Sequence, residues 1–393
     1  YYRAWGQYFE TRTEGQVAYD DANERVTLAL VTPLENTRVT SATASLSASG
    51  AFTINGASTD LCASNRGNYT DSYNSSGTSA GYCGQSPGND GDLVYGGDVD
   101  IDSGTGGDDI RGDVVSGGSV YVSNSMGGGQ PYVYGNISYT TNCDDCAGRI
   151  SDPSGDVTQI SGVDQASAIN GIVRARVDDL QGDSDNPTTG NVSGQTLDYT
   201  NAGTSDTVEL HAGEYYLQNV NVGTGDTVLL NTTAGDIVVG IEEDLDMASD
   251  SEIRVTGDGT ANVYVQAGGG TNRHLEMAPG ADITNSGDDA PQFRLFGPDN
   301  FTAVIGGGNS NYATYVGVIY APPGTSGTGT VTIDGGVVYG GILTGTTTIP
   351  NGGRGSIHYD EALRDIRVIE RGASVVRVTY IHASTNEVTV EDG

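Results

Sequence analysis

The feature that most constrains this chain is a run of very short apolar segments separated by glycine, asparagine or aspartate. They include Leu93-Val94-Tyr95, Val114-Val115, Val120-Tyr121-Val122 and Tyr132-Val133-Tyr134. Strands this short bury too few side chains to be stable alone, so each must stack on a neighbour. A turn residue at every corner is typical of the rungs of a β-solenoid.

The same pattern of short apolar runs separated by turn residues returns near Thr207 and continues to about Asp360. The centres of its apolar runs recur at intervals of roughly 19 to 30 residues, near one turn of a parallel β-helix with loops of variable length. These centres are Ile237, Val263, Phe293, Val316, Val338 and Ile357. We therefore predict an all-β fold with a right-handed parallel β-helix at its centre, flanking antiparallel β segments and one short helix.

The one good helical pattern lies near residues 164–181. Its apolar residues fall at spacings of three and four, and Gly182 ends it. They are Ile169, Ile172, Val173, Val177 and Leu180. This pattern predicts a helix that interrupts a solenoid spanning residues 91–363.

The two ends of the chain have a different sequence pattern. Residues 1–90 are predicted to hold the last turns of a helix, at Tyr1–Phe9, and a β module with a disulfide loop. Within it, β-prone runs flank Asp20–Asn23 as in a hairpin. Residues 364–393 alternate around Ser384–Asn386 and predict a C-terminal hairpin tail. The two end segments could pair with each other or complete a sheet in another subunit, and the second arrangement is favoured.

Charge narrows the function classes. The chain carries 51 acidic and 17 basic residues, a net charge of -34, and every basic residue is arginine. Such a chain is repelled by phosphate, which disfavours nucleic acid and a basic membrane-surface role. At molar salt carboxylates can crowd a surface without unfolding the chain, so a halophilic source is favoured over an acidic, calcium-loaded secreted protein.

The four cysteines are Cys62, Cys83, Cys143 and Cys146. The first two bracket a weakly apolar loop that could not fix its own shape, and the last two form a Cys-Asp-Asp-Cys turn. Disulfides are predicted, and Cys62–Cys83 with Cys143–Cys146 is favoured among three connectivities. A zinc site would need a second Cys-X-X-Cys knuckle, and acidic neighbours oppose redox catalysis.

The location predicted from sequence is extracellular or at the cell surface. No apolar stretch is long enough for a transmembrane helix, and the first residues lack a signal-peptide apolar region. Six sequons offer glycan acceptors, although a chain this rich in Asn, Ser and Thr contains several by chance. They are Asn68, Asn74, Asn136, Asn191, Asn231 and Asn300.

Several stretches carry a family resemblance. They are the runs Val316–Pro322, Val337–Gly341 and Ile357–Leu363, with Tyr19–Asn23 near one end and Val378–His382 near the other. Together they resemble haloarchaeal type IV pilin-like surface proteins with a β-helical, pilus-assembly-associated C-terminal domain. The resemblance implies a surface filament role and carries over no catalytic residues.

The residue patterns disfavour an enzyme. Paired carboxylates could serve a glycosidase, but neighbours on a strand point to opposite faces, so solvated acidic surface is the preferred interpretation. The pairs include Asp108-Asp109, Asp144-Asp145, Asp178-Asp179, Glu242-Glu243-Asp244 and Asp288-Asp289. No Gly-X-Ser-X-Gly elbow occurs. No catalytic, cofactor-binding or metal residues are therefore predicted.

Three further patterns receive the same structural interpretation. The acidic turn from Asp98 to Asp113 could bind calcium, but a solvated loop is favoured. His358 is predicted to be packed rather than to bind a ligand, and no two of the four histidines lie at ligand spacing. Glycine runs such as Gly127–Gly129 are predicted to be turn corners.

The function predicted from sequence is an extracellular structural subunit of a pilus-like filament or cell-surface appendage in a halophilic archaeon. Its partners would be further copies of itself, joined by strand addition, and possible cell-surface glycans. The alternatives are a polysaccharide-binding or polysaccharide-cleaving β-helix protein, and a viral or envelope spike.

Overall fold

The structure is a computed structural model that is mostly β, with 53% strand and one α-helix in the part it describes. It describes residues 15–20, 25–33, 43–45, 52–54, 68–76, 81–102, 109–123, 131–144, 146–151, 155–161, 170–182, 185–186, 192–193, 196–198, 206–267, 274–307, 311–321, 323, 329–350, 354–365, 373–381 and 388–392. The predicted helix end at residues 1–9 lies outside these ranges. None of the described helices is long and apolar enough to cross a membrane.

The chain divides into two units, residues 1–37 with 367–393, and residues 38–366. The first unit is a four-stranded antiparallel sheet of order β1-β2-β33-β34. Its strands are β1 (Gly15–Asp20), β2 (Arg25–Pro33), β33 (Ala373–Ile381) and β34 (Val388–Asp392). Both predicted hairpins are present, and they pair with each other through β2 and β33 within one chain, so the favoured arrangement, pairing with another subunit instead, is wrong for these two strands.

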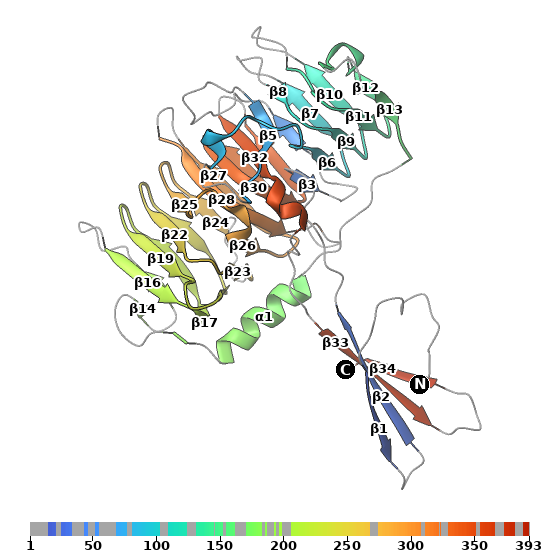
Figure 1. Ribbon diagram of the computed structural model, residues 1–393, viewed down its shortest axis with the longest axis vertical. Coiled ribbons are helices and arrows are strands. Elements are labelled where there is room, and N and C mark those ends of the chain that lie inside the picture. Colours follow the sequence, from blue (N-terminus) through green and yellow to red (C-terminus); the bar gives the residue numbers. More distant parts are fainter. Residues whose placement is uncertain are drawn as a thin grey trace. The chain divides into compact units, whose positions relative to one another are not determined.

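The second unit is a parallel β-solenoid, which confirms the predicted fold class (Figure 1). Its walls are three series of paired strands. The first wall is a 12-stranded sheet in which only β14 is antiparallel. In spatial order it contains β14 (Val192–Ser193), β15 (Thr196–Asp198), β18 (Asn219–Val222), β21 (Leu245–Met247), β24 (Leu275–Met277), β27 (Thr302–Gly306), β29 (Thr330–Asp334), β31 (Thr346–Ile349), β4 (Phe52–Ile54), β7 (Val99–Asp102), β10 (Val120–Ser123) and β12 (Cys143–Asp144).

The other two walls share the long strands β28 and β30. One contains β17 (Gly213–Leu217), β20 (Ile237–Ile241), β23 (Ala261–Val265), β26 (Phe293–Phe296), β28 (Ala313–Ala321), β30 (Gly336–Thr344), β3 (Thr43–Ser45), β6 (Leu93–Tyr95), β9 (Val114–Ser116), β11 (Ile137–Tyr139) and β13 (Val157–Gln159). The other contains β16 (Thr207–His211), β19 (Thr227–Asn231), β22 (Glu252–Thr256), β25 (Asp282–Thr284), the first residues of β28 and β30, β32 (Gly355–Asp360), β5 (Asn68–Tyr73) and β8 (Asp109–Ile110).

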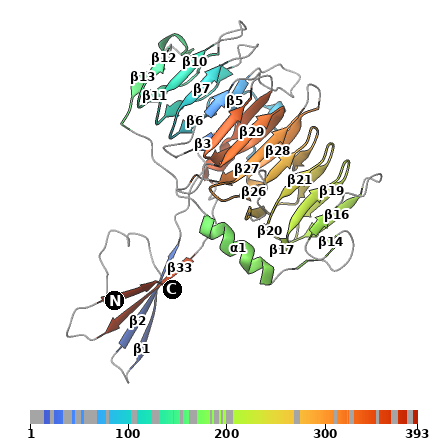
Figure 2. The same cartoon turned by 180° about the vertical axis from the view of Figure 1, so that it is seen from behind.

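The spatial order of the rungs differs from their order in the sequence. The stack begins near residue 192, runs to β32 and then continues with β3, β4 and β5 from the start of the chain. We call residues 43–160 the first half and residues 192–360 the second half (Figure 2). The chain therefore enters and leaves the solenoid at the middle of the stack.

This order changes the predicted domain boundaries. Residues 43–90 do not form a separate module, because β3, β4 and β5 belong to the walls of the solenoid. The boundaries near residues 90 and 363 become boundaries at 37 and 366. If the rungs stacked in sequence order, β3 and β4 would lie at one end of the solenoid. Instead, this chain begins its solenoid in the middle of the stack.

Side chains alternate along the strands, and the inward ones form the core. In β19 and β29 every second residue is buried, whereas β28 and β30 are buried along almost their whole length. Glycine lets these two long strands turn from one wall into the next. Gly340 has a φ of 142°, and a Cβ there would collide with the carbonyl oxygen of Gly317.

The helix α1 (Asn170–Gly182) lies against the second half of the solenoid. It starts within the predicted range of residues 164–181, and residues 162–169 are not described. Val173, Val177 and Leu180 are buried. Gly240 provides room for the helix, because a Cβ there would lie 2.9 Å from Leu180 Cδ1. Four short 3-10 helices complete the described elements: η1 (Tyr82–Gly84), η2 (Cys146–Gly148), η3 (Ala290–Gln292) and η4 (Glu361–Asp365).

Candidate functional site

A group of buried polar side chains lies where the two halves of the solenoid meet. There β32 of the second half pairs with β5 of the first, and His358 lies opposite Asp71. On the other side of β32, His358 lies opposite Tyr339 of β30. These side chains point outward from the wall but are covered by Tyr82 of η1, whose ring stacks on His358 at a centroid distance of 4.0 Å.

A chain of hydrogen bonds runs through this cluster. Ser356 Oγ lies 3.0 Å from His358 Nε2, and His358 Nδ1 lies 2.6 Å from Asp71 Oδ1. Tyr82 donates its hydroxyl proton to Asp71 Oδ2 at 2.7 Å. Ser356 and Asp71 have no exposed surface, and His358 has 2%. Both oxygens of the buried Asp71 carboxylate are therefore hydrogen-bonded, as a buried charge requires.

A second carboxylate, Asp360, organises the neighbouring backbone. Its Oδ1 accepts from the backbone N–H groups of Ser75 and Ala362, both at 3.0 Å. Its Oδ2 accepts from Ser75 Oγ at 2.6 Å and from the Ala290 N–H at 3.2 Å. Burial raises the pKa of Asp360, although these hydrogen bonds oppose the shift. One side chain thus joins the segment after β5 to η3 and η4.

The acidic pair Asp288-Asp289 belongs to the same cluster. Asp288 Oδ2 accepts from the Tyr82 N–H at 3.0 Å, and the Asp288 carbonyl accepts from the Tyr73 hydroxyl at 2.5 Å. Burial raises the pKa of Asp289. Burial is also the main reason why the pKa of Tyr73 lies well above its usual value, and nearby carboxylates raise it further. This pair was predicted to be solvated, but its polar groups fasten the first half onto the second.

The Ser356–His358–Asp71 order is the hydrogen-bond order of a nucleophile, a general base and an orienting acid. A hydrolase also needs the nucleophile to meet substrate, and here Ser356 is sealed beneath a cluster of tyrosines and valines. Tyr339 also stacks on His358, at 5.2 Å. The geometry therefore supports a polar joint between the two halves. The prediction that His358 is packed is confirmed.

The other predicted acidic pairs do not converge on one place. Glu242 accepts a hydrogen bond from the Tyr216 hydroxyl, and Glu243 accepts from Gln218 and Asn219. Asp178 forms an exposed ion pair with Arg174 on α1. Among the described residues, no group of three or more metal-ligating side chains comes together. Asp108 and Asp145 lie outside the described ranges.

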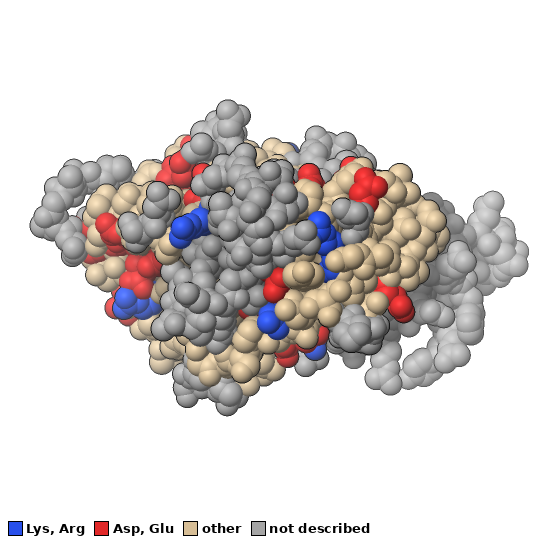
Figure 3. All heavy atoms as spheres, turned by 90° about the horizontal axis from the view of Figure 1, so that it is seen from above, with Lys and Arg blue, Asp and Glu red and all other residues tan. Residues whose placement is uncertain are grey.

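Several carboxylates have a structural use that the sequence did not suggest. Asp92 Oδ1 accepts from the backbone N–H of Asp113 one rung away, and Asp113 Oδ1 accepts in turn from the N–H of Asn136. Asn136 Oδ1 then accepts from the Asp156 N–H. This corner ladder links consecutive rungs of the first half. On the face in Figure 3, acidic side chains of the described residues lie in separate groups, with basic ones beside some of them.

The predicted disulfide between Cys143 and Cys146 is confirmed. Cys83 is also disulfide-bonded, while Cys62 lies outside the described residues. Among the sequons, the Asn74 side chain accepts a local hydrogen bond, those of Asn136 and Asn231 bond to neighbouring rungs, and Asn300 is exposed at a turn. Asn191 and the side chain of Asn68 are not described. Of the glycine runs, Gly127–Gly129 and Gly268–Gly270 are also not described.

Four residues of this cluster were not predicted from the sequence: Asp71, Tyr82, Ser356 and Asp360. A signal existed in Ser356-Ile357-His358-Tyr359-Asp360, where polar residues alternate with apolar ones along a strand whose residues are all buried. That alternation indicates a polar outward face that another segment must cover. The covering segment, residues 69–90, is hundreds of positions away in the sequence.

Residues 152–366 match a protein family described as a domain of unknown function, DUF7305. This match covers more than half of the chain. The chain belongs to this family. No curated protein and no solved structure matches it. The DUF7305 region contains α1 and the whole second half of the solenoid, including Ser356, His358 and Asp360, whereas Asp71 and Tyr82 lie outside it.

Proposed function

We propose that this DUF7305 chain is an extracellular structural subunit of a pilus-like filament or cell-surface appendage, with a mechanical or adhesive rather than an enzymatic role. The observation that supports this most is the small sheet in which both ends of the chain meet. Its outer strands, β1 and β34, each pair on one side only within the described part of the chain. Such strands can accept another strand by backbone hydrogen bonding.

The order of this sheet favours open-ended growth. All neighbouring strands are antiparallel, so the first and fourth strands of the sheet run in opposite directions. When β1 of one copy lies beside β34 of the next, the alternation continues unbroken. This head-to-tail contact can repeat, because a heterologous interface that does not close produces a filament. It uses no strand of the solenoid.

Charge and cysteine chemistry support the proposed environment. A net charge of -34 opposes self-association in dilute buffer, and molar salt screens it. Disulfides such as Cys143–Cys146 persist outside the reducing cytosol. A salt-rich extracellular setting satisfies both conditions, and the resemblance to haloarchaeal pilin-like proteins is consistent with it.

Proline substitutions in β34 test this proposal. In an edge strand, alternate N–H groups face the partner strand and the open side. Thr389→Pro and Val390→Pro are made as separate variants, and each removes one of two consecutive N–H groups. One of these N–H groups faces the open side, so the variant that removes it leaves the hydrogen bonds to β33 intact. We expect wild-type filaments in electron micrographs at molar NaCl, and folded chains that no longer polymerise for that variant.

A substitution in an exposed turn of the solenoid, away from the small sheet in sequence, gives the matched control. Asn300→Ala changes an exposed turn residue of the solenoid, and it should leave the filaments unchanged. A wild-type chain that stays free of filaments at molar salt would contradict the proposal. So would filaments that persist in both proline variants.

A further inference from the structure

The two ends of the solenoid stack are finished differently. At the second-half end, β14 pairs antiparallel with β15. The side chain of Asn186 closes the edge of β17, because its amide accepts from the Tyr216 N–H and donates to the Tyr216 carbonyl. Asp185 also accepts from the Glu214 N–H at 3.0 Å. At this end β17 is capped by its own chain, whereas β16 pairs only with β19 among the described strands.

The opposite end finishes with β13, which pairs only with β11 among the described strands. The Asp156 carbonyl accepts from the Ile137 N–H, and the Ile160 N–H donates to the Tyr139 carbonyl. Because ladder bonds alternate along a strand, the N–H and C=O groups of Val157 and Gln159 face away from β11. No described strand pairs with them.

The last rung also exposes part of the core. Val157 continues the core position of Ile137, and Ile150 continues that of Val133. Ile137 and Val133 have no exposed surface, but Val157 and Ile150 are only half-buried. A solenoid end with partly exposed core residues and free backbone groups needs a cap or a partner.

A third, independent feature is Arg149, in the turn that precedes Ile150. Its side chain is 8% exposed, and Nη1 is buried without a hydrogen-bond partner. Among the described residues no carboxylate pairs with it, although the chain carries 51 acidic residues. A buried guanidinium nitrogen without a hydrogen-bond partner is costly, and a carboxylate from another molecule that pairs with this side chain would reduce that cost.

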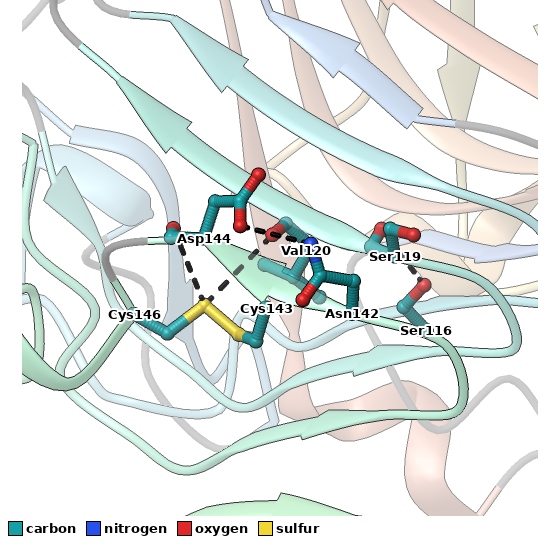
Figure 4. Close-up of a disulfide and its surroundings, with 7 residues drawn as sticks. All are labelled: Ser116, Ser119, Val120, Asn142, Cys143, Asp144 and Cys146. Carbon is teal, nitrogen blue, oxygen red and sulfur yellow. Dashed lines mark hydrogen bonds between the residues drawn. A yellow bond between two sulfur atoms is a disulfide. The ribbon is translucent and has the colours of Figure 1, made fainter.

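A disulfide and a side-chain hydrogen bond constrain the end rung. Figure 4 shows the Cys143–Cys146 disulfide beside β10, with Cys146 Sγ 3.9 Å from the Val120 carbonyl oxygen. Asn142 Nδ2 donates to Asp144 Oδ1 at 2.8 Å. A pre-ordered surface loses little entropy when it binds a partner.

We propose that this open end is an interface with a second copy of the chain. The two β13 strands would pair antiparallel about a two-fold axis, burying Val157 and Ile150 of both copies. An antiparallel strand pair is self-complementary, which a second copy satisfies without any further partner. The end also carries both charges, since Asp144 and Asp156 are exposed and Arg149 pairs with no carboxylate of the described part of the chain. This contact is separate from the sheet edges, and with them it would crosslink filaments.

The test measures dimerisation by sedimentation in molar NaCl. A chain with both Thr389→Pro and Val390→Pro serves as background, so the result does not depend on whether the sheet edges assemble. We expect this background to dimerise. Gln159→Pro removes an open-side N–H and keeps the ladder to β11. It should weaken the dimer at least tenfold, and Arg149→Gln should do the same.

Arg174→Gln is the matched control, because Arg174 is an exposed arginine on α1. It should leave the dimer unchanged. Thermal melting of each variant checks that the monomer is still folded, and Arg149→Gln provides the answer if Gln159→Pro does not fold. A background chain that stays monomeric, or a dimer unaffected by a folded Gln159→Pro or Arg149→Gln chain, would overturn the proposal.

Discussion

The two halves of the solenoid reach the same architecture with different means. Strands of the second half are up to nine residues long, as in β28 and β30, and their core contains Phe293, Phe296 and Tyr315. Those of the first half have two to four residues, apart from β5. The second half also carries α1 against its wall.

Short strands bury less apolar surface, so the first half depends more on polar and covalent links. It contains the corner ladder from Asp92 to Asp156, the Cys143–Cys146 disulfide and the buried joint to β32. A rung too short to be stable through burial can therefore be held by its corners and by its neighbours. Variants of each link should therefore affect the first half more than the second.

Loss of the buried polar joint between the two halves should have the largest effect on stability. Asp71→Ala leaves His358 and the Tyr82 hydroxyl without their carboxylate in a buried place. We expect unfolding of the first half to be favoured by about 3–5 kcal/mol. Urea denaturation in molar NaCl should then separate into two transitions. Asp90→Ala, which removes an exposed ion pair with Arg364, should change stability by less than about 1 kcal/mol.

Removal of the disulfide should have the next largest effect. Replacing Cys143 and Cys146 by serine frees a very short loop, for which the chain-entropy relation gives about 2 kcal/mol. The loss should appear in the first-half transition, because both cysteines lie in its last rung. An equal loss in the second half would show that the halves do not differ in this way.

The ladder residue Asp92 should make stability depend on pH. Burial raises its pKa to about 6, above the ordinary 3.8. The folded chain therefore binds protons more readily than the unfolded chain, and stability should increase as pH falls from 7 to 4. Asp92→Asn keeps an acceptor for Asp113 and should stabilise the chain by about 1–2 kcal/mol at pH 7. At pH 4 this difference should vanish, as urea titrations at both pH values would detect.

A single rung link should have the smallest effect. Asn136→Ala removes the acceptor for the Asp156 N–H and should cost about 1 kcal/mol in the first-half transition. Asn300→Ala, at an exposed turn in the second half, should change neither transition. Equal effects of the two substitutions would contradict the importance of the corner ladder.

The sequence could predict the solenoid because the cause is local. A short apolar run with glycine or aspartate at each corner needs stacked neighbours wherever it occurs, and Ile237, Val263 and Ile357 are buried in strands as expected. The hairpins at both ends were predictable for the same reason. Cys143 and Cys146 were also predicted to pair, because three positions in sequence already bring them close.

The joint could not be predicted, because its partners are distant in sequence. Nothing near Ser356 or His358 indicates that Asp71 will lie beside them, since that contact depends on the chain entering its stack in the middle. Asp113 looked like a solvated charge because the backbone N–H group that it accepts from belongs to another rung.

The non-sequential stack is the central claim, and hydrogen exchange at molar NaCl tests it most directly. Strand β32 is the last strand of the second half and β5 lies near the start of the first half, and they pair in the middle of the stack. Their amides should exchange as slowly as those of β28, and those of β13 should exchange faster. Fast exchange in β32 and β5, as expected for terminal rungs of two separate solenoids, would contradict the account.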